Sequence, residues 1–503
     1  MANKGSLSEK TGVVVFARII TTVIDLAIAV ATIQLLSKTD FAVIGYLLMI
    51  HEVARNLATL GFPESVFYYF ERVTKNARKA FVLQTTGILF LMGLLAGGAI
   101  LGVARFAPAL LSNWEFSSIN TVQGLLPLIA LVTVLEVPTW PVTNILLASD
   151  RQKESSWYEM ITSVLTFSCL VGPLFLGYSL TVAVYGLLVY GVVRFVGSII
   201  WMMLVLPERV EKDSGIPLRE QFSFSIPLGF SSLVNKINRY VDKFVVSILL
   251  SASAYAEYYI GAQEVPIIRV IPFAVGSVLI SRYVNFHLES KKEELLNLWY
   301  KGIEKVSLMV LPLTILSIII ASDLISLIAE SEGTSYQNAV VPFQIYNLIV
   351  LIRVTHYGSI LQAFGDTKGV MYLSINLVVA NILLSIPLTI WLGITGTALS
   401  TLLANLYNWY IMLKRIGGHL DLKPSKVLPF GYYLKVLGTA VVVAIPVWIS
   451  RVYLFDEGQV LLGLAWSIPV YLILFSLAGS FFGVISSNDW KQLREWLSLK
   501  FLR

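Results

Sequence analysis

The sequence predicts an all-α polytopic membrane protein with fourteen transmembrane helices, and three observations lead to this fold class. Of its 503 residues, 56% are apolar and only 14% are charged, against about 45–50% and about 25% in soluble domains. The apolar residues gather in stretches of about 20, the length that crosses a bilayer as a helix. Basic residues concentrate in alternate loops. This composition excludes a soluble enzyme, a disordered chain and an ordinary nucleic-acid binder.

The fourteen predicted spans are defined by their apolar stretches. Prolines or charges interrupt the second, the fourth and the tenth of them. In chain order the spans lie near 12–36, 41–70, 80–104, 120–148, 156–177, 181–206, 222–250, 254–281, 303–328, 339–363, 370–391, 393–413, 429–450 and 459–485.

The loops indicate the orientation of the chain. If the N-terminus is cytoplasmic, the loops on that side hold 24 Lys and Arg residues, and the opposite side holds Lys38, Arg105 and Arg451. This bias predicts that both termini are cytoplasmic. The expected location of the chain is the cell inner (plasma) membrane. Two segments, 284–301 and the C-terminal tail from Asp489, are predicted as amphipathic helices at the cytoplasmic headgroup level, with a plain linker helix as the alternative.

An internal repeat divides the chain. The tripeptide Leu-Leu-Ser at 35–37 recurs at 249–251, and at the same offset Arg55 falls on Arg269. Further on, ILLASDRQK at 145–153 falls on ILQAFGDTK at 360–368, at an almost identical offset. Six spans separate the copies, so both halves enter the membrane in the same direction and a pseudo-twofold axis along the membrane normal is expected.

The repeat predicts three regions. These are an N-terminal lobe of spans 1–6 (1–215), a C-terminal lobe of spans 7–12 (216–425), and spans 13–14 with the amphipathic tail (426–503). Two parallel lobes form a cleft, and rocking about such a cleft is the usual geometry of alternating access. The arrangement therefore indicates transport.

Charged residues inside the predicted spans require an explanation, because a charge at the bilayer centre costs about 2.5–3.5 kcal/mol. Among the charged residues of the spans, the basic ones outnumber the acidic ones by three. This surplus of positive charge favours an anionic ligand such as phosphate. The alternative is that they form internal pairs, such as Arg18–Asp25 and Glu52–Arg55. The charged residues are Arg18, Arg55, Arg194, Lys236, Arg239, Lys243, Arg269 and Arg353, with Asp25, Glu52, Glu136, Asp242 and Glu264.

Span 7 is the most polar of the fourteen. Its polar residues, from Asn235 to Lys243, fall within about 160° of the helix, so one face is expected to line a water-filled space. We expect Asp242 on this face to pair with a neighbouring cation or to bind a coupling ion. The predicted substrate-binding cations are Arg18, Arg55, Arg239, Arg269, Lys236 and Arg353, and the predicted ion-coupling or cleft acids are Asp25, Glu52, Asp242 and Glu264.

Motifs for catalysis are missing from the sequence. It contains no phosphate-binding Gly-x4-Gly-Lys-Ser/Thr loop, no Cys/His cluster and no His-Glu-x-x-His. We therefore expect neither an enzyme nor a metal site, and no cofactor other than a coupling ion.

Four segments carry a family resemblance: LLSKTDFAVIGY at 35–46, LGF at 60–62, ILQAFGDTKGVMYLSINLVVANILL from 360, and LGITGTALSTLLANL at 392–406. In this order the chain resembles polysaccharide (oligosaccharide) flippases of the Wzx type, in the superfamily of multidrug and toxic compound extruders and the lipid II flippase. The resemblance implies a V-shaped, two-lobed fold. It also implies transfer of a lipid-diphosphate-linked oligosaccharide from the cytoplasmic to the outer leaflet for surface polysaccharide, such as the O-antigen of lipopolysaccharide.

The resemblance also implies site residues and partners. Arg18, Arg55 and Arg269 lie on the spans whose arginines engage the charged head of the substrate in the lipid II flippase. A sodium site would use Asp242, Asn376 and Thr397, although Ala380 stands near where a second carboxylate is expected. Sodium or a proton would then be the coupling ion. The implied partners are a polyprenyl-diphosphate-linked oligosaccharide, membrane lipids, and a polysaccharide polymerase or other assembly proteins.

Two other classes of function stay open at this point. One is a cation-coupled exporter of drugs or other small molecules, for which surplus cations have the wrong sign because most such substrates are cationic. The other is a membrane-embedded polymerase, ligase or glycosyltransferase, which needs more ordered external material than the short predicted loops supply.

Overall fold

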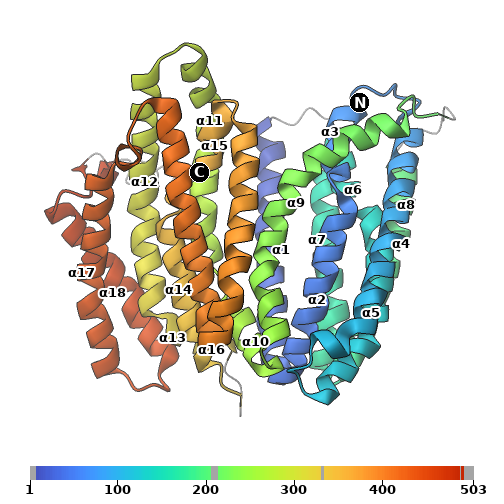
Figure 1. Cartoon of the computed structure of the whole chain (residues 1–503), viewed down its shortest axis with the longest axis horizontal. Coiled ribbons are helices and arrows are strands. Elements are labelled where there is room, and N and C mark those ends of the chain that lie inside the picture. Colours follow the sequence, from blue (N-terminus) through green and yellow to red (C-terminus); the bar gives the residue numbers. More distant parts are fainter. Residues whose placement is uncertain (1–6, 206–212, 330–333, 488, 492–503) are drawn as a thin grey trace. The chain divides into compact units, whose positions relative to one another are not determined.

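The computed structural model describes residues 7–205, 213–329, 334–487 and 489–491, and within these ranges the chain is helical, with no β-strand element. Contacts divide it into two compact units, an N-terminal unit (residues 1–256) and a C-terminal unit (residues 257–503). Figure 1 shows the helices of both units. The predicted fold class, an all-α membrane fold, is confirmed.

The N-terminal unit is organised around helix α5, which packs against α2, α4 and α8, while α7 packs against α1 and α8. Helix α9 packs against α2 and α3. The elements are α1 (Leu7–Leu35), α2 (Lys38–Thr59), α3 (Phe62–Phe70), α4 (Arg78–Leu110), α5 (Phe116–Glu136), η1 (Val137–Thr139), α6 (Val142–Ala148), α7 (Gln152–Phe175), α8 (Leu180–Val205) and α9 (Leu218–Leu249), followed by α10 (Ala252–Gly261) across the boundary.

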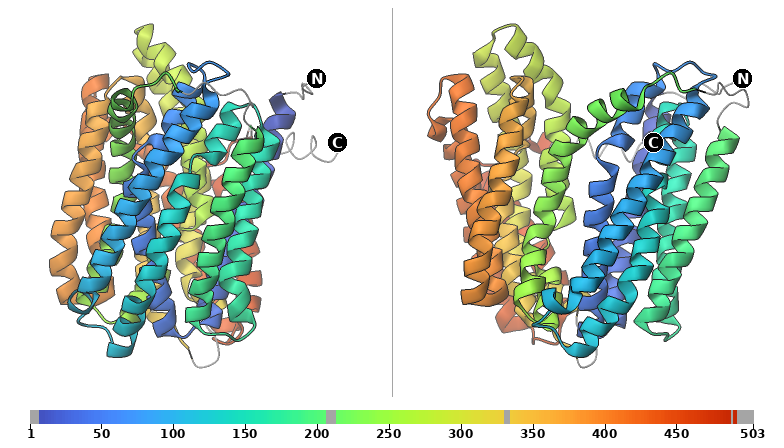
Figure 2. Two further views of the ribbon diagram at one scale, coloured as in Figure 1. Left: turned by 90° about the vertical axis from the view of Figure 1, so that its right-hand side faces the viewer. Right: turned by 45° about the vertical axis from the view of Figure 1, so that its right-hand side comes forward.

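The C-terminal unit is organised around helix α12, which packs against α11, α14 and α17. Helices α17 and α18 pack against each other (Figure 1). Figure 2 shows the helices from two further directions. The elements are α11 (Pro266–Leu288), α12 (Lys292–Ile319), α13 (Ala321–Ala329), η2 (Gln337–Ala339), α14 (Val340–Leu351), α15 (Tyr357–Ala363), α16 (Thr367–Leu420), η3 (Pro424–Lys426), α17 (Phe430–Leu454) and α18 (Val460–Phe481).

Ten helical stretches of the described chain are long and apolar enough to cross a membrane. The three spans that prolines or charges interrupt in the sequence are each broken into shorter helices: α2 and α3, α5 and α6, and α14 and α15. The 54-residue α16 covers two predicted spans, since Gly393 inside it has a non-helical φ of 60°. The exact count of fourteen spans and the lobe boundaries near 215 and 425 stay predictions.

The predicted surface helix at 284–301 is wrong. Helix α11 ends at Leu288 and α12 begins at Lys292, with Ser290 at a positive φ of 57° in the turn between them. Trp299 is fully buried, its Nε1 donates to the carbonyl of Val427 (2.9 Å), and its ring meets that of Tyr283. Apart from Leu288, which is exposed, the apolar residues of this segment therefore pack into or against the core of the unit. Of the predicted amphipathic tail, residues 492–503 lie outside the described residues.

The internal repeat reappears in the helix boundaries. Helix α1 ends at Leu35 and α9 ends at Leu249, the two positions that the Leu-Leu-Ser match aligns, and the starts of α2 and α10, and of α4 and α12, align with the same offset. Both ends of α6 and α15 align with the offset of the second match, as do the starts of α7 and α16. The positive φ of Asp150 recurs at its aligned position, Gly365. The repeat thus fixes where the chain breaks its helices.

Two glycines let the turn after α2 touch helix α9. Gly61 has a φ of 77°, in the left-handed region that favours glycine. A Cβ at Gly61 would meet backbone atoms of Ser225 and Gly229, and a Cβ at Gly229 would meet the backbone of Leu60. The α2–α3 turn and α9 therefore approach each other backbone to backbone.

Replacing Gly229 with valine is expected to lower the free energy of unfolding by about 1–3 kcal/mol, because the new side chain has to displace the backbone of Leu60. The measurement is the thermal unfolding midpoint of the purified protein in detergent. Gly197→Val on α8 is the matched control, since a Cβ there meets nothing within 4 Å. Equal midpoints for the two variants would contradict the prediction.

Candidate functional site

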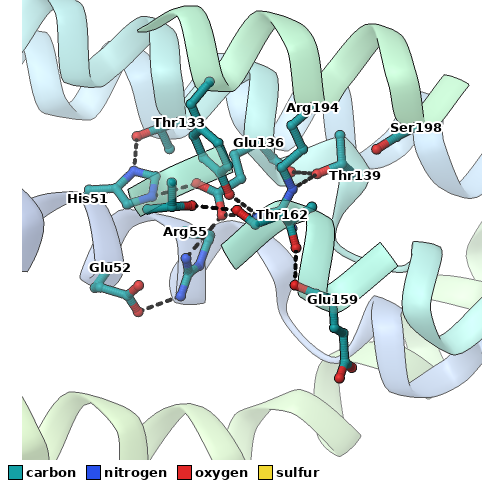
Figure 3. A network of polar contacts seen from close by, with 12 residues as sticks. His51, Glu52, Arg55, Thr133, Glu136, Thr139, Glu159, Thr162, Arg194 and Ser198 are labelled. Atoms are coloured by element: carbon teal, nitrogen blue, oxygen red, sulfur yellow. Dashed lines mark hydrogen bonds and ion pairs between the residues drawn. The ribbon is translucent and has the colours of Figure 1, made fainter. Parts of the chain in front are cut away.

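A buried charge centre lies in the N-terminal unit around Glu136, the last residue of α5. The helix breaks there because Pro138 and Pro141 follow, and proline cannot donate the next backbone hydrogen bonds. The break is buried, as Val137 has an exposed fraction of 0%. Figure 3 shows side chains from α2, α5 and α8 meeting at this carboxylate.

Both oxygens of the Glu136 carboxylate are occupied. Oε1 accepts from Nη1 of Arg194 (2.8 Å) and from Nη1 of Arg55 (3.3 Å), and Oε2 bonds to Nε2 of His51 (2.8 Å). The four side chains are between 5% and 11% exposed. A buried charge needs such partners, because an unpaired one costs several kcal/mol.

The tautomer of His51 follows from its second neighbour. The hydroxyl of Thr133 donates to the carbonyl of Ile129 (2.8 Å), so it accepts from Nδ1 of His51 (2.8 Å). With a hydrogen on Nδ1, the bond between Nε2 and Glu136 also requires a proton. The centre can therefore hold one proton shared between the imidazole and the carboxylate.

Trp140 completes the centre in the turn between η1 and α6. The guanidinium carbon of Arg55 lies 3.9 Å from the centre of this ring, and that of Arg194 lies 5.4 Å from it. Arg194 also donates Nε to the hydroxyl of Thr139 (2.9 Å) and bonds to the hydroxyl of Tyr190. The ring and the hydroxyls hold the two guanidinium groups in fixed positions.

Arg55, a predicted substrate-binding cation, is thus already engaged. Besides Glu136 it bonds through Nη2 to Glu52 (2.5 Å), the internal pair that the sequence offered as an alternative. The other predicted pair does not form: Arg18 and Asp25 are both exposed on α1 and make no ion pair with each other.

Three of the predicted cations, unlike Arg55, have no carboxylate partner in the described chain. Arg18 and Arg239 are exposed and Lys236 is half-buried. None of the three forms an ion pair with an acidic residue of the described chain, although Arg18 interacts electrostatically with Glu159 on α7. The side chains of Arg269 and Asn235 lie outside the described residues. Arg18, Lys236 and Arg239 all belong to the N-terminal unit.

The polar residues of α9 divide into an exposed and a buried group. Asp242 is 2% exposed and Lys243 is 8% exposed. Oδ1 of Asp242 accepts the backbone N–H of Lys243 (2.8 Å), and Nζ of Lys243 donates to the carbonyl of Arg239 (3.4 Å). The exposed group contains Arg239 itself. Asp242 thus lies inside the N-terminal unit rather than on its surface.

The C-terminal unit contains a smaller ion pair, in which the side chain of Arg353 is 40% exposed. Glu264, 10% exposed, accepts from Nη1 of Arg353 (2.5 Å), and Nη2 of Arg353 donates to Asn405 (3.0 Å). Oε2 of Glu264 is buried and has no hydrogen-bond partner within the described ranges. Arg353, a predicted substrate-binding cation, is therefore also held by an acid.

The predicted sodium-site residues have separate partners. Asn376 donates to Asn408 (3.4 Å), and Thr397 is hydrogen-bonded to Thr389 (2.7 Å). Both residues are on α16, whereas Asp242 belongs to the other unit. The sodium site stays a prediction. In the part of the chain that the structure describes, no three His, Cys, Asp or Glu residues form a metal-binding group.

Sequence reasoning did not connect His51 and Arg194 to Glu136. The available signal was an acid placed directly before two prolines in the fourth span, which marks a helix break with freed polar groups. A second missed pair joins α13 to α17, where Arg451 binds both carboxylate oxygens of Asp323 (2.7 and 2.9 Å).

A further polar cluster closes α16 on itself. Oδ1 of Asp366 accepts from the backbone of Gly369 (3.0 Å) and from Nη2 of Arg415 (2.8 Å), and Oδ2 bonds to Nε of Arg415 and to His419 (3.0 Å). The start of α16 thus meets its end, because Gly393 reverses the chain between them. Hydrogen bonds from Arg415 hold the pKa of Asp366 well below its usual range, against the opposing effect of burial.

This cluster predicts an acid-dependent contribution to stability. Because the pKa of Asp366 is lowered on folding, its contribution is present above the ordinary pKa of about 4 and is lost as the pH falls further. Asp366→Asn should lower the free energy of unfolding by about 1–2 kcal/mol at pH 7 and by less near pH 3. The measurement is the unfolding midpoint of both proteins across this range, with Glu115→Gln as control. If the midpoints of the wild type and Asp366→Asn differ by the same amount at every pH, the prediction is contradicted.

Comparisons with known proteins place this geometry in context. Residues 33–339 match the family described as "Polysaccharide biosynthesis protein". No curated protein matches the sequence. The structure is similar to the lipid II flippase MurJ in an inward closed conformation, with a TM-score of 0.72, 16% identity, and coverage of 93% of this chain and 98% of that chain.

Two further solved structures share the fold. One is an inward-facing multidrug resistance MATE family transporter of the MOP superfamily (TM-score 0.66, 13% identity, 80% of this chain and 94% of that chain). The other is a MOP superfamily transporter from Pyrococcus furiosus Vc1 (DSM3638) (TM-score 0.53, 12% identity, 82% and 94%). The chain therefore has the fold of these membrane transporters and is a multi-pass membrane protein. The resemblance to the flippase superfamily is confirmed.

Proposed function

Because the chain belongs to the polysaccharide biosynthesis protein family, we propose that it is a flippase for a lipid-diphosphate-linked oligosaccharide. It would move this substrate from the cytoplasmic to the outer leaflet of the inner membrane by alternating access, and the glycan would enter a surface polysaccharide such as O-antigen. Family membership and the flippase and transporter fold support a membrane transporter. The substrate and the direction are our proposal.

The observation that carries the substrate class is the set of cations without an ion-pair partner in the described chain. Arg18 on α1 and Lys236 and Arg239 on α9 occupy helices of the N-terminal unit, where an uncompensated charge is costly. A diphosphate supplies two negative charges and oxygens that suit the arginine fork. Arg55 and Arg353 have carboxylate partners, so we assign the first contact with the diphosphate to the other three cations.

A cation-coupled drug exporter of the same superfamily is the alternative. Its fold would be the same, but a site containing Arg18, Lys236 and Arg239 repels the cationic substrates that such exporters carry. The sign of these charges therefore favours an anionic substrate. A polysaccharide polymerase or another assembly protein would take the product at the outer leaflet.

The coupling ion is part of the same proposal. The coupling ion would be sodium or a proton, and a proton would use the hydrogen bond between His51 and Glu136. Sodium and pH gradients applied separately across a proteoliposome membrane distinguish the two, since only the coupling ion should change the initial rate.

The test of the function uses the purified full chain in proteoliposomes that contain a fluorescent polyprenyl-diphosphate oligosaccharide. Transfer between leaflets is measured as the fraction of label that a membrane-impermeant quencher reaches. We expect transfer to be faster than in protein-free liposomes, and export of a cationic dye to stay at the protein-free level. Dye export without lipid transfer would overturn the proposal in favour of the alternative.

A further inference from the structure

An apolar groove lies between helices α4 and α8 of the N-terminal unit. Its volume is about 400 Å³. Leu83, Phe90, Phe195 and Met203 are among the side chains that line it, and Gly87 leaves part of its wall open. Both helices pack against α5, which lies behind the groove. The groove is therefore open to the surroundings of the unit and apolar along its walls.

One end of the groove carries a charge. Lys79 is half-buried at the first turn of α4 and lines the groove, and it forms no ion pair with an acidic residue of the described chain. Its neighbour Arg78 is already engaged: it donates to the carbonyl of Phe70 (3.1 Å) and pairs with Glu71 (3.5 Å). Lys79 is thus available to a ligand at the mouth of the groove.

The opposite end of the groove is formed by two aromatic rings. Phe90 and Phe195 both line it, and their ring centres are 6.2 Å apart. From Lys79 to Phe90, α4 rises about 16 Å. This is close to one leaflet, about half of a hydrocarbon core of about 30 Å. The length fits an acyl chain of a phospholipid, and a polyprenyl chain is longer than the groove.

We propose that this groove binds one acyl chain of an anionic phospholipid whose headgroup phosphate contacts Lys79. The loop before α4 is predicted to face the cytoplasmic leaflet, where anionic lipids are enriched. The ammonium group selects the charge of the headgroup, and the apolar walls hold the chain. The groove would be a lipid site that does not depend on the transported substrate.

The test is native mass spectrometry of the full chain after extraction from vesicles of phosphatidylglycerol and phosphatidylcholine in equal parts. The wild type is expected to retain phosphatidylglycerol in preference to phosphatidylcholine. Lys79→Gln should lower this preference roughly fivefold, the effect of one basic contact near the membrane surface. Gly87→Phe should lower the retention of both lipids, since its ring fills open space in the groove.

Two control variants distinguish the loss of headgroup preference and the loss of lipid retention from a general destabilisation of the protein. Lys75→Gln removes a charge from the same loop without touching the groove, and Gly98→Phe adds a ring on α4 where a Cβ also meets nothing. Both controls should retain lipid as the wild type does. Retention that is equal in all five proteins would overturn the site. Preference of the wild type for an added polyprenyl phosphate over phosphatidylglycerol would overturn the choice of occupant.

Discussion

Changing Glu136 to glutamine is expected to lower the free energy of unfolding by about 3–5 kcal/mol, the loss typical of removing one partner from a buried ion pair. The carboxylate is 5% exposed and takes hydrogen bonds from Arg55, Arg194 and His51. A neutral amide leaves the two guanidinium groups with too little negative charge. It also offers one acceptor oxygen where the carboxylate uses two.

The measurement is the thermal unfolding midpoint of the purified variant in detergent, with the yield of monodisperse protein as a second readout. Glu159→Gln is the control, because Glu159 lies in the same region (Figure 3) and forms no ion pair with a described cation. The double variant Glu136→Gln with Arg194→Met should regain part of the loss, since it removes one of the stranded charges. If the single variant unfolds like the wild type, the centre does not stabilise the unit.

Arg239→Ala should reduce lipid transfer roughly 10- to 100-fold, while the free energy of unfolding stays within about 0.5 kcal/mol of the wild type. Arg239 is exposed on α9 and forms no ion pair with a described acid. Its loss should therefore remove the proposed contact with the diphosphate without leaving a buried carboxylate unpaired. Arg239→Lys should restore little activity if the contact with the diphosphate is bidentate. Initial rates in proteoliposomes at equal protein density measure both variants.

Arg55→Ala gives the contrasting result. Its guanidinium is held by Glu52 and Glu136, so we expect a lowered unfolding midpoint together with slower transfer. Arg105→Ala, an exposed arginine near the end of α4, should change neither property. Normal transfer by Arg239→Ala and by Arg18→Ala would show that these cations do not bind the substrate.

The sequence predicts the helices of this fold well, because apolar length and helix-breaking residues are local properties. The interruptions at Leu60–Gly61, at Pro138 and Pro141, and at Ile352–His356 all lie in spans that the sequence marks as interrupted. The prediction for the segment at 284–301 is wrong because periodicity cannot tell whether Trp299 faces a membrane surface or the packed core of a unit.

The charge pairs are harder to predict, because they depend on which helices become neighbours. Glu52 and Arg55 are three residues apart on one helix, and that pair follows from spacing alone. Glu136 lies 81 residues from Arg55 and 58 from Arg194, and only the packing of α2 and α8 on α5 brings these groups together. The surplus of cations in the sequence therefore does not tell which of them have partners.

Both units place an ion pair at the matching helix break, but the acid and the cation have exchanged places. In the N-terminal unit the acid, Glu136, lies at the break after α5 and its cations lie on α2 and α8. In the C-terminal unit the cation, Arg353, lies at the matching break after α14 and its acid, Glu264, lies beside α10. The position of the helix break in this fold is thus independent of whether an acid or a cation occupies it. A redesign could exchange acid and base across a break while keeping every turn of the chain.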